Sequence, residues 1–306
     1  PFARLRSCCT RCRDWTAPAQ AGLYSDITLY VHADFNREPV TISRERKNLL
    51  ARTMRTSPHL RVLLRSLSIT EGRHINDSCL DWLRLIPPHT LRRLEYKCSS
   101  PESFFLASLM DAPAVKTVIS LIVWKISSMD MLKAVLVPGL ESLSLTVDRA
   151  LDGEFELGEL PPKLTKLAIL CPWHYFCPAP YKGPQAPKIV RSYGSRIIRP
   201  FLDELVLHCT RLEHLAVVAG TYTERLFQRL PSSVKVLEFV GNQEPIPFED
   251  ALIDAIARAG RKTIALSRIV VLSYEYELIG KREYARLAEA CVMNDVQFEY
   301  VEEMSG

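Results

Sequence analysis

Apolar residues recur along the chain in one pattern, in which an apolar position is followed by a second three residues later and by a third two residues after that. The pattern has the form Leu-x-x-Leu-x-Leu, with other apolar residues at some positions. It occurs at Leu64-Leu67-Ile69, Leu91-Leu94-Tyr96, Val118-Leu121-Val123, Leu140-Leu143-Leu145, Leu164-Leu167-Ile169, Leu212-Leu215-Val217, Val234-Leu237-Phe239 and Ile269-Leu272-Tyr274. The middle residues of successive triplets lie 27, 27, 22, 24, 48, 22 and 35 residues apart. Most of these spacings fall within the 20 to 29 residues of a leucine-rich repeat.

Each triplet predicts a short strand with one apolar face. A single strand and helix cannot bury that face alone, so the units are expected to stack around one continuous core. The fold class expected is α/β: an irregular leucine-rich-repeat solenoid, with parallel strands on the concave side and helices on the convex side. The repeats are irregular because the Asn that usually completes the pattern occurs only once, at Asn242. The alternative is an ordinary α/β domain with several buried strands.

Helix-like stretches alternate with the strands, and prolines end the earlier ones. Because a residue before proline disfavours helical geometry, Pro58, Pro87, Pro113 and Pro138 mark helix ends. We expect helices at residues 42–54, 77–86, 102–111, 129–136, 197–209, 248–258 and 282–293. Strands are also expected at residues 27–31 and 297–301, the latter with acidic residues that protect an exposed edge. Residues 171–187 contain five prolines and predict a long loop.

Composition places the chain among globular proteins. Of its 306 residues, 47% are hydrophobic and 24% are charged, which is enough to bury a large core and excludes disorder of the whole chain. The formal charge of +4 is local, since residues 1–75 hold 13 Lys and Arg against 6 Asp and Glu. No aromatic stripe or nucleic-acid motif accompanies this basic segment, so a nucleic-acid partner is not expected.

The cysteines and the apolar runs bear on the compartment. The nine cysteines are an odd number scattered through a long chain, unlike the dense, even sets of small secreted domains. No apolar run reaches the 18 residues of a membrane-spanning helix, and the first residues lack a signal-peptide pattern. We therefore expect a protein of the cytoplasm or nucleus with no membrane partner. Because the chain begins with Pro1 rather than Met, we also expect further sequence upstream.

The segment CRDWTAPAQAGLYSDITL resembles the last part of an F-box followed by its first connecting strand. Its first part carries Cys12, Arg13 and Trp15, and its second part carries Leu23, Tyr24, Ile27 and Leu29. Together with phrases such as TRLEHLAV, the chain looks like the F-box and leucine-rich-repeat proteins common in fungi. The repeat resemblance covers about residues 60–300, and the F-box resemblance covers fewer than 30 residues.

The resemblance implies a substrate receptor of an SCF-type cullin ubiquitin ligase. The F-box would bind a Skp-type adaptor, for which Cys12, Arg13, Trp15, Leu23 and Tyr24 are a remnant, and the repeats would hold a protein substrate. The earlier F-box helices would lie upstream of Pro1. Residues 1–31 are then the end of an F-box with its first strand, and residues 32–306 are the leucine-rich-repeat domain. The alternative is a leucine-rich-repeat scaffold unrelated to ubiquitination.

Candidate chemistry is sparse. Cys9 and Cys12 with Cys8 beside them could begin a zinc site, but a second pair at suitable spacing is missing, and ordinary thiols explain them. Cys171, His174 and Cys177 form a second weak set in the proline-rich loop. No phosphate loop, zinc-protease motif, nucleophile elbow or carboxylate pair occurs, so no enzyme, metal or cofactor is expected. An irregular α/β enzyme is the remaining rival, and it would need a constellation that this sequence does not show.

Alternation of side chains along a strand indicates the binding surface. If the triplet residues face the core, the residues between and after them face the concave side. The candidate protein-binding residues are therefore Arg93, Glu95, Lys97, Ile122, Trp124, Ser144, Lys166, Leu170, His214, Val218, Glu238 and Val240, and the last triplet adds Val271 and Ser273 to this side. Its apolar members would form an exposed patch of the kind that marks interaction sites. Alternatively, residues 172–187 cover them.

Overall fold

The computed structural model of the chain describes residues 13–31, 40–71, 80–98, 106, 109–126, 128–147, 161–170, 202–219, 221–240, 246–274 and 281–303. Several sequence predictions fall outside these ranges or concern side chains that are not described: the loop 171–187, the cysteines Cys8, Cys9 and Cys12, the set Cys171, His174 and Cys177, Ser273, and the side chains of Arg13 and Trp15. Contacts divide the chain into two compact units, Pro1–Lys125 with Ala134–Leu140, and Ile126–Lys133 with Glu141–Gly306. Each unit is described by itself.

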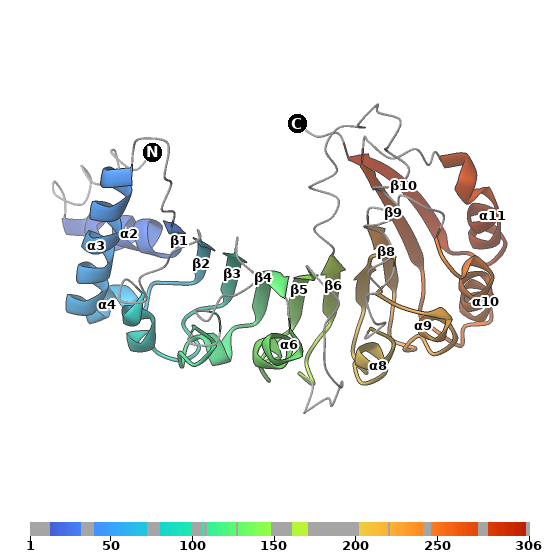
Figure 1. Ribbon diagram of the computed structural model, residues 1–306, viewed down its shortest axis with the longest axis horizontal. Coiled ribbons are helices and arrows are strands. Elements are labelled where there is room, and N and C mark those ends of the chain that lie inside the picture. Colours follow the sequence, from blue (N-terminus) through green and yellow to red (C-terminus); the bar gives the residue numbers. More distant parts are fainter. Residues whose placement is uncertain are drawn as a thin grey trace, which may run out of the picture. The chain divides into compact units, whose positions relative to one another are not determined.

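In the part of the first unit that the structure describes, four strands pair in chain order and all run parallel. They are β1 (Asp26–Val31), β2 (Ser66–Glu71), β3 (Arg93–Cys98) and β4 (Ser120–Ile126). The helical elements of this unit are α2 (Arg13–Tyr24), α3 (Val40–Thr56), α4 (Pro58–Arg61), η2 (Asp81–Leu85) and η3 (Val115–Thr117). Of these, α2 packs against β1 and α4 and lies at the outer end of the sheet, shown in blue in Figure 1.

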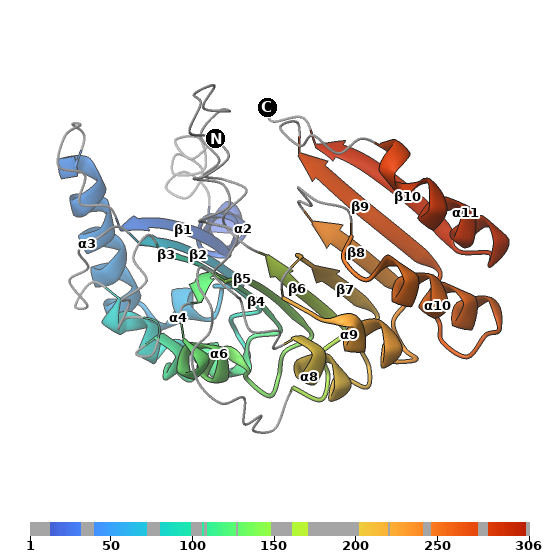
Figure 2. The same ribbon diagram turned by 45° about the vertical axis from the view of Figure 1, so that its right-hand side comes forward.

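The described residues of the second unit form six strands, again parallel and in chain order. They are β5 (Ser142–Val147), β6 (Lys166–Leu170), β7 (His214–Val217), β8 (Val236–Val240), β9 (Arg268–Tyr274) and β10 (Gln297–Glu303). One face of this sheet is covered by helices, as Figure 2 shows: α8 (Leu202–Leu207), α9 (Glu224–Gln228), α10 (Glu249–Gly260) and α11 (Ala285–Met293), the last entered through η5 (Lys281–Tyr284). A further helix, α6 (Met129–Val135), lies between β4 and β5 in the chain.

A hydrogen-bond pattern recurs where the strands begin. The carbonyl of the residue before one strand accepts two bonds, from the first amide of the next strand and from the amide just before it. Arg65 O, for example, accepts from Arg92 N at 2.8 Å and from Arg93 N at 3.0 Å. The same double acceptor occurs at Ser25, Arg65, Arg92, Glu141, Thr165, Glu213 and Lys235. Each strand is therefore joined to the next in the same way within each sheet.

The core lies between each sheet and its helices, on the side to which the triplet leucines point. The predicted core residues Leu94, Leu143, Leu167, Leu215 and Leu237 are all no more than 1% exposed, which confirms the prediction. On the other side of the strands Arg93 and Lys166 are exposed, as predicted, and Ser144 is half-buried. The chain is thus an α/β protein of parallel strands and helices, and the strand phase follows the sequence pattern.

The last triplet was assigned three residues too late, which exchanges the two faces of the strand. Ile269-Leu272-Tyr274 predicted that Leu272 faces the core and Val271 faces away from it. In the structure Val271 pairs with Phe239 in the core and is 1% exposed, whereas Leu272 pairs with Val240 on the opposite side and is half-buried. The correct triplet is therefore Leu266-Ile269-Val271, and the assignment of Val271 to the concave side was wrong.

Three of the helix predictions agree closely with the part of the chain that the structure describes. The predicted helices 42–54, 129–136 and 248–258 correspond to α3, α6 and α10. Three were too long in the described part: η2 is a five-residue 3₁₀ turn instead of a helix over 77–86, α8 spans only Leu202–Leu207, and the segment 282–293 begins as the 3₁₀ turn η5. None of the described helices is long and apolar enough to cross a bilayer.

Side-chain hydrogen bonds tie neighbouring helices of the second unit together. Asp203 at the start of α8 is 7% exposed and accepts from the backbone N–H of Thr223 at 3.0 Å, while Thr223 itself caps α9. At the other end of α9, Arg258 of α10 donates to the carbonyls of Phe227 and Gln228. Because buried polar groups without partners are costly, these bonds fix where the short helix α9 starts and stops.

Replacing Gly260 with Ala is expected to destabilise the second unit by about 1–3 kcal/mol, because a side chain is forced into filled space. A Cβ at Gly260 would lie 3.0 Å from the Cβ of Asn294 and closer still to its Oδ1. Asn294 cannot move away freely, since its Nδ2 donates to Ala290 O at 2.8 Å.

Gly22 in α2 provides the matched control for this substitution. Nothing lies within 4 Å of a Cβ there, so Gly22→Ala should stabilise the chain by about 0.5–1 kcal/mol through helix propensity. Urea denaturation of both variants makes the comparison. A Gly260→Ala protein as stable as Gly22→Ala would show that the contact with Asn294 is not tight.

The two thiols of the second unit's core predict a loss of stability at alkaline pH. Burial raises the pKa of Cys209 to about 11 and that of Cys291 to about 12, from a usual value of 9.0. The folded state holds these protons more tightly than the unfolded state. Their contribution to the free energy of unfolding is therefore complete below pH 9 and is lost as the pH rises through 11 and 12. Each thiol should contribute a slope of up to about 1.4 kcal/mol per pH unit.

Urea denaturation between about pH 8 and pH 11 measures this slope. The double variant Cys209→Ala with Cys291→Ala should lose less stability over that range than the parent, although it is less stable at the lower pH. Tyr222, whose pKa is also raised by burial, remains in both proteins and cancels in the comparison. Equal slopes would contradict the prediction.

Candidate protein-binding face

The side of each sheet that points away from the core residues is called here the second face. In the first unit it is formed by the rows Asp26, Ser66, Arg93 and Ser120; Thr28, Ser68, Glu95 and Ile122; and Thr70, Lys97 and Trp124. Short hydroxyl side chains occupy β2, whereas long charged and apolar side chains occupy β3 and β4. The strand register therefore brings five of the predicted binding residues together on two neighbouring strands.

Trp124 and Lys97 form the most structured part of the first unit's second face. They are register partners on β4 and β3, and the Lys97 ammonium lies 5.0 Å from the centroid of the Trp124 ring. The same ammonium is 2.9 Å from the carboxylate of Glu95. A cation above an indole contributes about 0.5–1 kcal/mol at a partly exposed site, and the ion pair adds little. Lys97 and Glu95 hold each other in place beside a half-buried tryptophan.

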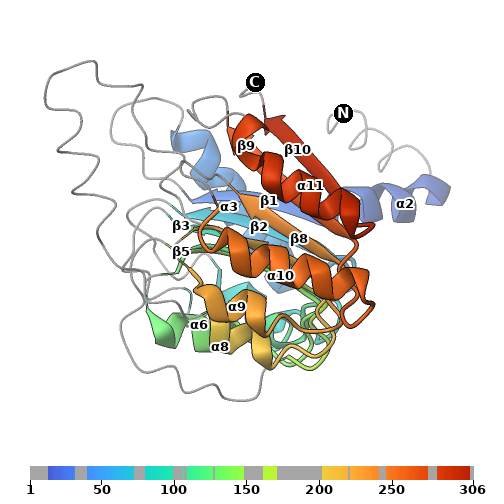
Figure 3. The ribbon, with the colours of Figure 1, turned by 90° about the vertical axis from the view of Figure 1, so that its right-hand side faces the viewer.

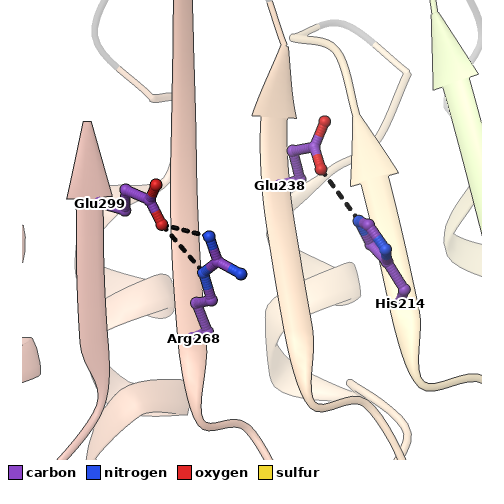
Figure 4. Close-up of polar contacts among 4 residues, drawn as sticks. All are labelled: His214, Glu238, Arg268 and Glu299. Carbon is purple, nitrogen blue, oxygen red and sulfur yellow. Dashed lines mark hydrogen bonds and ion pairs between the residues drawn. The ribbon is translucent and has the colours of Figure 1, made fainter. Parts of the chain in front are cut away.

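The second unit's second face has a polar half at the amino ends of its strands. His214 of β7 lies 2.9 Å from the carboxylate of Glu238 on β8, and Arg268 of β9 contacts Glu299 on β10, with its Nε 3.0 Å from Oε2 (Figure 4). Both pairs are diagonal, because His214 is in register with Val236 and Arg268 with Gln297. In each pair the base stands two positions before the acid of the next strand.

The carboxyl ends of the same strands carry an apolar cluster. Ala216, Val218 and Val240 are only 4–5% exposed, and the half-buried Ala168, Leu170 and Leu272 pack against them. Val218 and Val240 are therefore closed to a partner in this structure, while Leu170 remains partly open. Whether the loop 171–187 covers this cluster lies outside the described residues.

All twelve predicted binding residues occupy second-face positions. Arg93 and Lys166 are exposed; Glu95, Lys97, Ile122, Trp124, Ser144, Leu170, His214 and Glu238 are half-buried; Val218 and Val240 are buried. The prediction missed Arg268, Val270, Leu272 and Glu299, which share this face. The apolar run IVVL at residues 269–272 matches the triplet in more than one phase, and choosing Leu266 as its first member would have found Arg268, Val270 and Leu272. Glu299 lies on β10, for which no triplet was assigned.

The described residues offer little to a metal ion or a catalytic reaction. Among them, no three His, Cys, Asp or Glu side chains group as metal ligands would. His214 Nε2 donates to the carboxylate of Glu238 on the neighbouring strand, and His208 is an exposed turn residue after α8.

Comparison with known proteins adds no family. No protein-family model matches the chain, and no curated protein matches it significantly.

Proposed function

We propose that this chain is a protein-binding receptor that recognises its partner with the second faces of its sheets. The observation that supports the proposal most directly is the second face itself, on which the side chains of parallel strands point away from the core. On β3 and β4 this face presents Arg93, Glu95, Lys97, Ile122 and Trp124, a mixture of charge and aromatic surface that is common in protein interfaces. The partner is a protein, and no cofactor takes part.

We further propose that the repeating strands are irregular leucine-rich repeats, with the second faces on the concave side and the helices on the convex side. Two observations support this. The triplet leucines are buried in nearly every strand. In addition, the carbonyl before a strand repeatedly accepts hydrogen bonds from two amides at the start of the next strand. Repeats of this kind form extended binding surfaces, and their function depends on the surface residues rather than on the fold.

In the whole protein this receptor would deliver a substrate to an SCF-type cullin ubiquitin ligase in the cytoplasm or nucleus. Support comes from the segment that resembles the end of an F-box. It forms the helix α2, which leads through Ser25 directly into β1, in the order that the resemblance implies. Leu23 and Tyr24 are half-buried on α2, and the rest of an adaptor-binding surface would come from the F-box helices upstream.

Site-specific photo-crosslinking in cells tests the binding face. A photoreactive phenylalanine is placed at Ser68 or Ser144 on the second faces, and at the exposed Lys116 or Glu204 on the helical side as matched controls. Small side chains on the face leave room for the probe. We expect one protein to be crosslinked from Ser68 and Ser144 and not from Lys116 and Glu204. Crosslinks of equal yield from both sets would contradict the proposal.

Reconstitution with recombinant adaptor and cullin tests the ligase role separately. The full-length protein should co-purify with a Skp-type adaptor, and the crosslinked partner should be ubiquitinated only when both are present. Residues 1–306 alone should bind the adaptor weakly or not at all. A full-length protein that binds its partner but no adaptor would identify a scaffold outside ubiquitination.

A further inference from the structure

The sheet of the second unit ends at β10 with a core that is left partly open. Interior strands bury their core residues fully, as shown by Phe239 and Ile269, which are 0% exposed. The corresponding residues of β10, Phe298 and Tyr300, are only half-buried. No described strand or helix lies on the outer edge of β10, which faces the viewer with α11 in Figure 3.

The last helix carries an apolar stripe on the side turned away from α10. Arg286 of α11 contacts Glu249 and Asp250 of α10, which marks the side of the helix turned toward α10. Ala288 lies about 200° around the helix from Arg286, and Val292 follows one turn later on the same stripe. Ala288 is half-buried and Val292 is 80% exposed, so Val292 supplies most of the stripe's open surface. Since α11 packs against β10, this exposed apolar side chain belongs to the same end of the unit.

The backbone of β10 is positioned to take another strand. Gln297 N donates inward to Ser267 O, so in a parallel ladder the amides of Phe298, Tyr300 and Glu302 point outward. The residue before each of seven earlier strands supplies a carbonyl that accepts hydrogen bonds from two amides at the start of the next strand. Val296 O stands in the same place before β10, and no described residue donates to it among the loop and turn contacts.

Charge indicates what kind of strand fits this edge. Residues 281–303 hold three Lys and Arg against six Asp and Glu, and β10 itself contains Glu302 and Glu303 besides Glu299, whose carboxylate is paired with Arg268. Acidic residues on an edge discourage pairing between identical strands, because two copies would repel each other. The same charges favour a strand with basic residues. A second copy of β10 is therefore the disfavoured occupant.

We propose that the outer edge of β10 is a second interaction surface, which binds an extended segment of a partner protein by strand addition. The segment alternates apolar residues, which cover Phe298, Tyr300 and Val292, with Lys or Arg residues on the other side. Main-chain hydrogen bonds to the outward amides supply affinity, and the apolar and basic positions supply specificity. This surface is distinct from the second faces, so it does not depend on the receptor proposal.

Two labelled peptides of identical composition test the proposal. In one, lysine alternates with valine or isoleucine over about seven residues, the length of a typical strand; in the other, the lysines are grouped at the ends. Fluorescence anisotropy at physiological salt should show at least about tenfold tighter binding of the alternating peptide. Hydrogen exchange should then slow at the outward amides of Phe298 and Tyr300. Equal binding of both peptides, or no binding of either, would overturn the proposal.

Two variants assign the binding to this edge. Tyr300→Pro removes an outward donor without removing a bond to β9, and edge strands tolerate proline, so binding should fall at least about tenfold. Val292→Arg removes apolar surface at the open end and should act in the same direction. Met293→Arg is the matched control, since Met293 is 72% exposed but lies on the stripe of Arg286, and it should bind as the parent does.

Because Val292 is 80% exposed, Val292→Arg should fold normally, so it still tests the proposal if Tyr300→Pro does not fold. Sedimentation of the parent protein supplies the remaining arm. Self-association that Tyr300→Pro abolishes would show that the edge pairs with a second copy, which contradicts the proposed basic partner strand.

Discussion

Truncation of Leu167 to alanine is expected to lower the free energy of unfolding of the second unit by about 2–5 kcal/mol. Leu167 is 1% exposed and lies on β6 between Leu143 of β5 and Leu215 of β7 in the core row of the sheet. Its removal loses the transfer free energy of the side chain and leaves a cavity that neighbouring strands cannot close. The fixed strand register prevents collapse, so the upper half of the range is expected.

The adjacent residue provides the matched control. Lys166 is exposed on the second face of the same strand, and Lys166→Ala should change stability by no more than about 0.5 kcal/mol. Urea denaturation followed by circular dichroism measures both variants. If the two substitutions had equal effects, the side-chain alternation of β6 would be misassigned, and with it the second face.

The sequence predicted the strands well because their signal is local. In β2, β3 and β5 apolar and polar residues alternate, and the triplet fixes which side is buried. β9 is the exception, since Ile269, Val270, Val271 and Leu272 are all apolar and are compatible with either phase. A strand apolar on both faces carries no alternation to read. Here the second face is apolar because Val270 and Leu272 lie beside Val240.

Features that depend on distant residues could not be predicted in this way. The diagonal pair of His214 and Glu238 depends on the register between β7 and β8, which the sequence of neither strand specifies. The five-residue helix α9 begins where Thr223 meets the carboxylate of Asp203, twenty positions earlier in the chain. Too few residues form α9 for a helical period to be visible. Its position is set by tertiary hydrogen bonds.

Replacement of Trp124 by alanine is expected to separate binding from folding. Trp124 is half-buried on the second face of β4 and lies against the Lys97 ammonium, so it should stabilise the first unit by no more than about 1 kcal/mol. As a partner anchor it would bury much of its roughly 150–250 Å² of surface on binding. Trp124→Ala should then weaken binding of the partner identified by crosslinking by about 2 kcal/mol or more, roughly a thirtyfold change in Kd.

Trp82 in the same unit is the reference for a tryptophan that belongs to the core. It is 1% exposed in η2, and Trp82→Ala should cost about 3–5 kcal/mol in stability. Urea denaturation of the two variants decides the role of Trp124 before any partner is known. An anchor that is open to a partner makes few contacts in the free protein, so its removal should cost little stability. If Trp124→Ala lowered the free energy of unfolding as much as Trp82→Ala, Trp124 would be a covered structural residue.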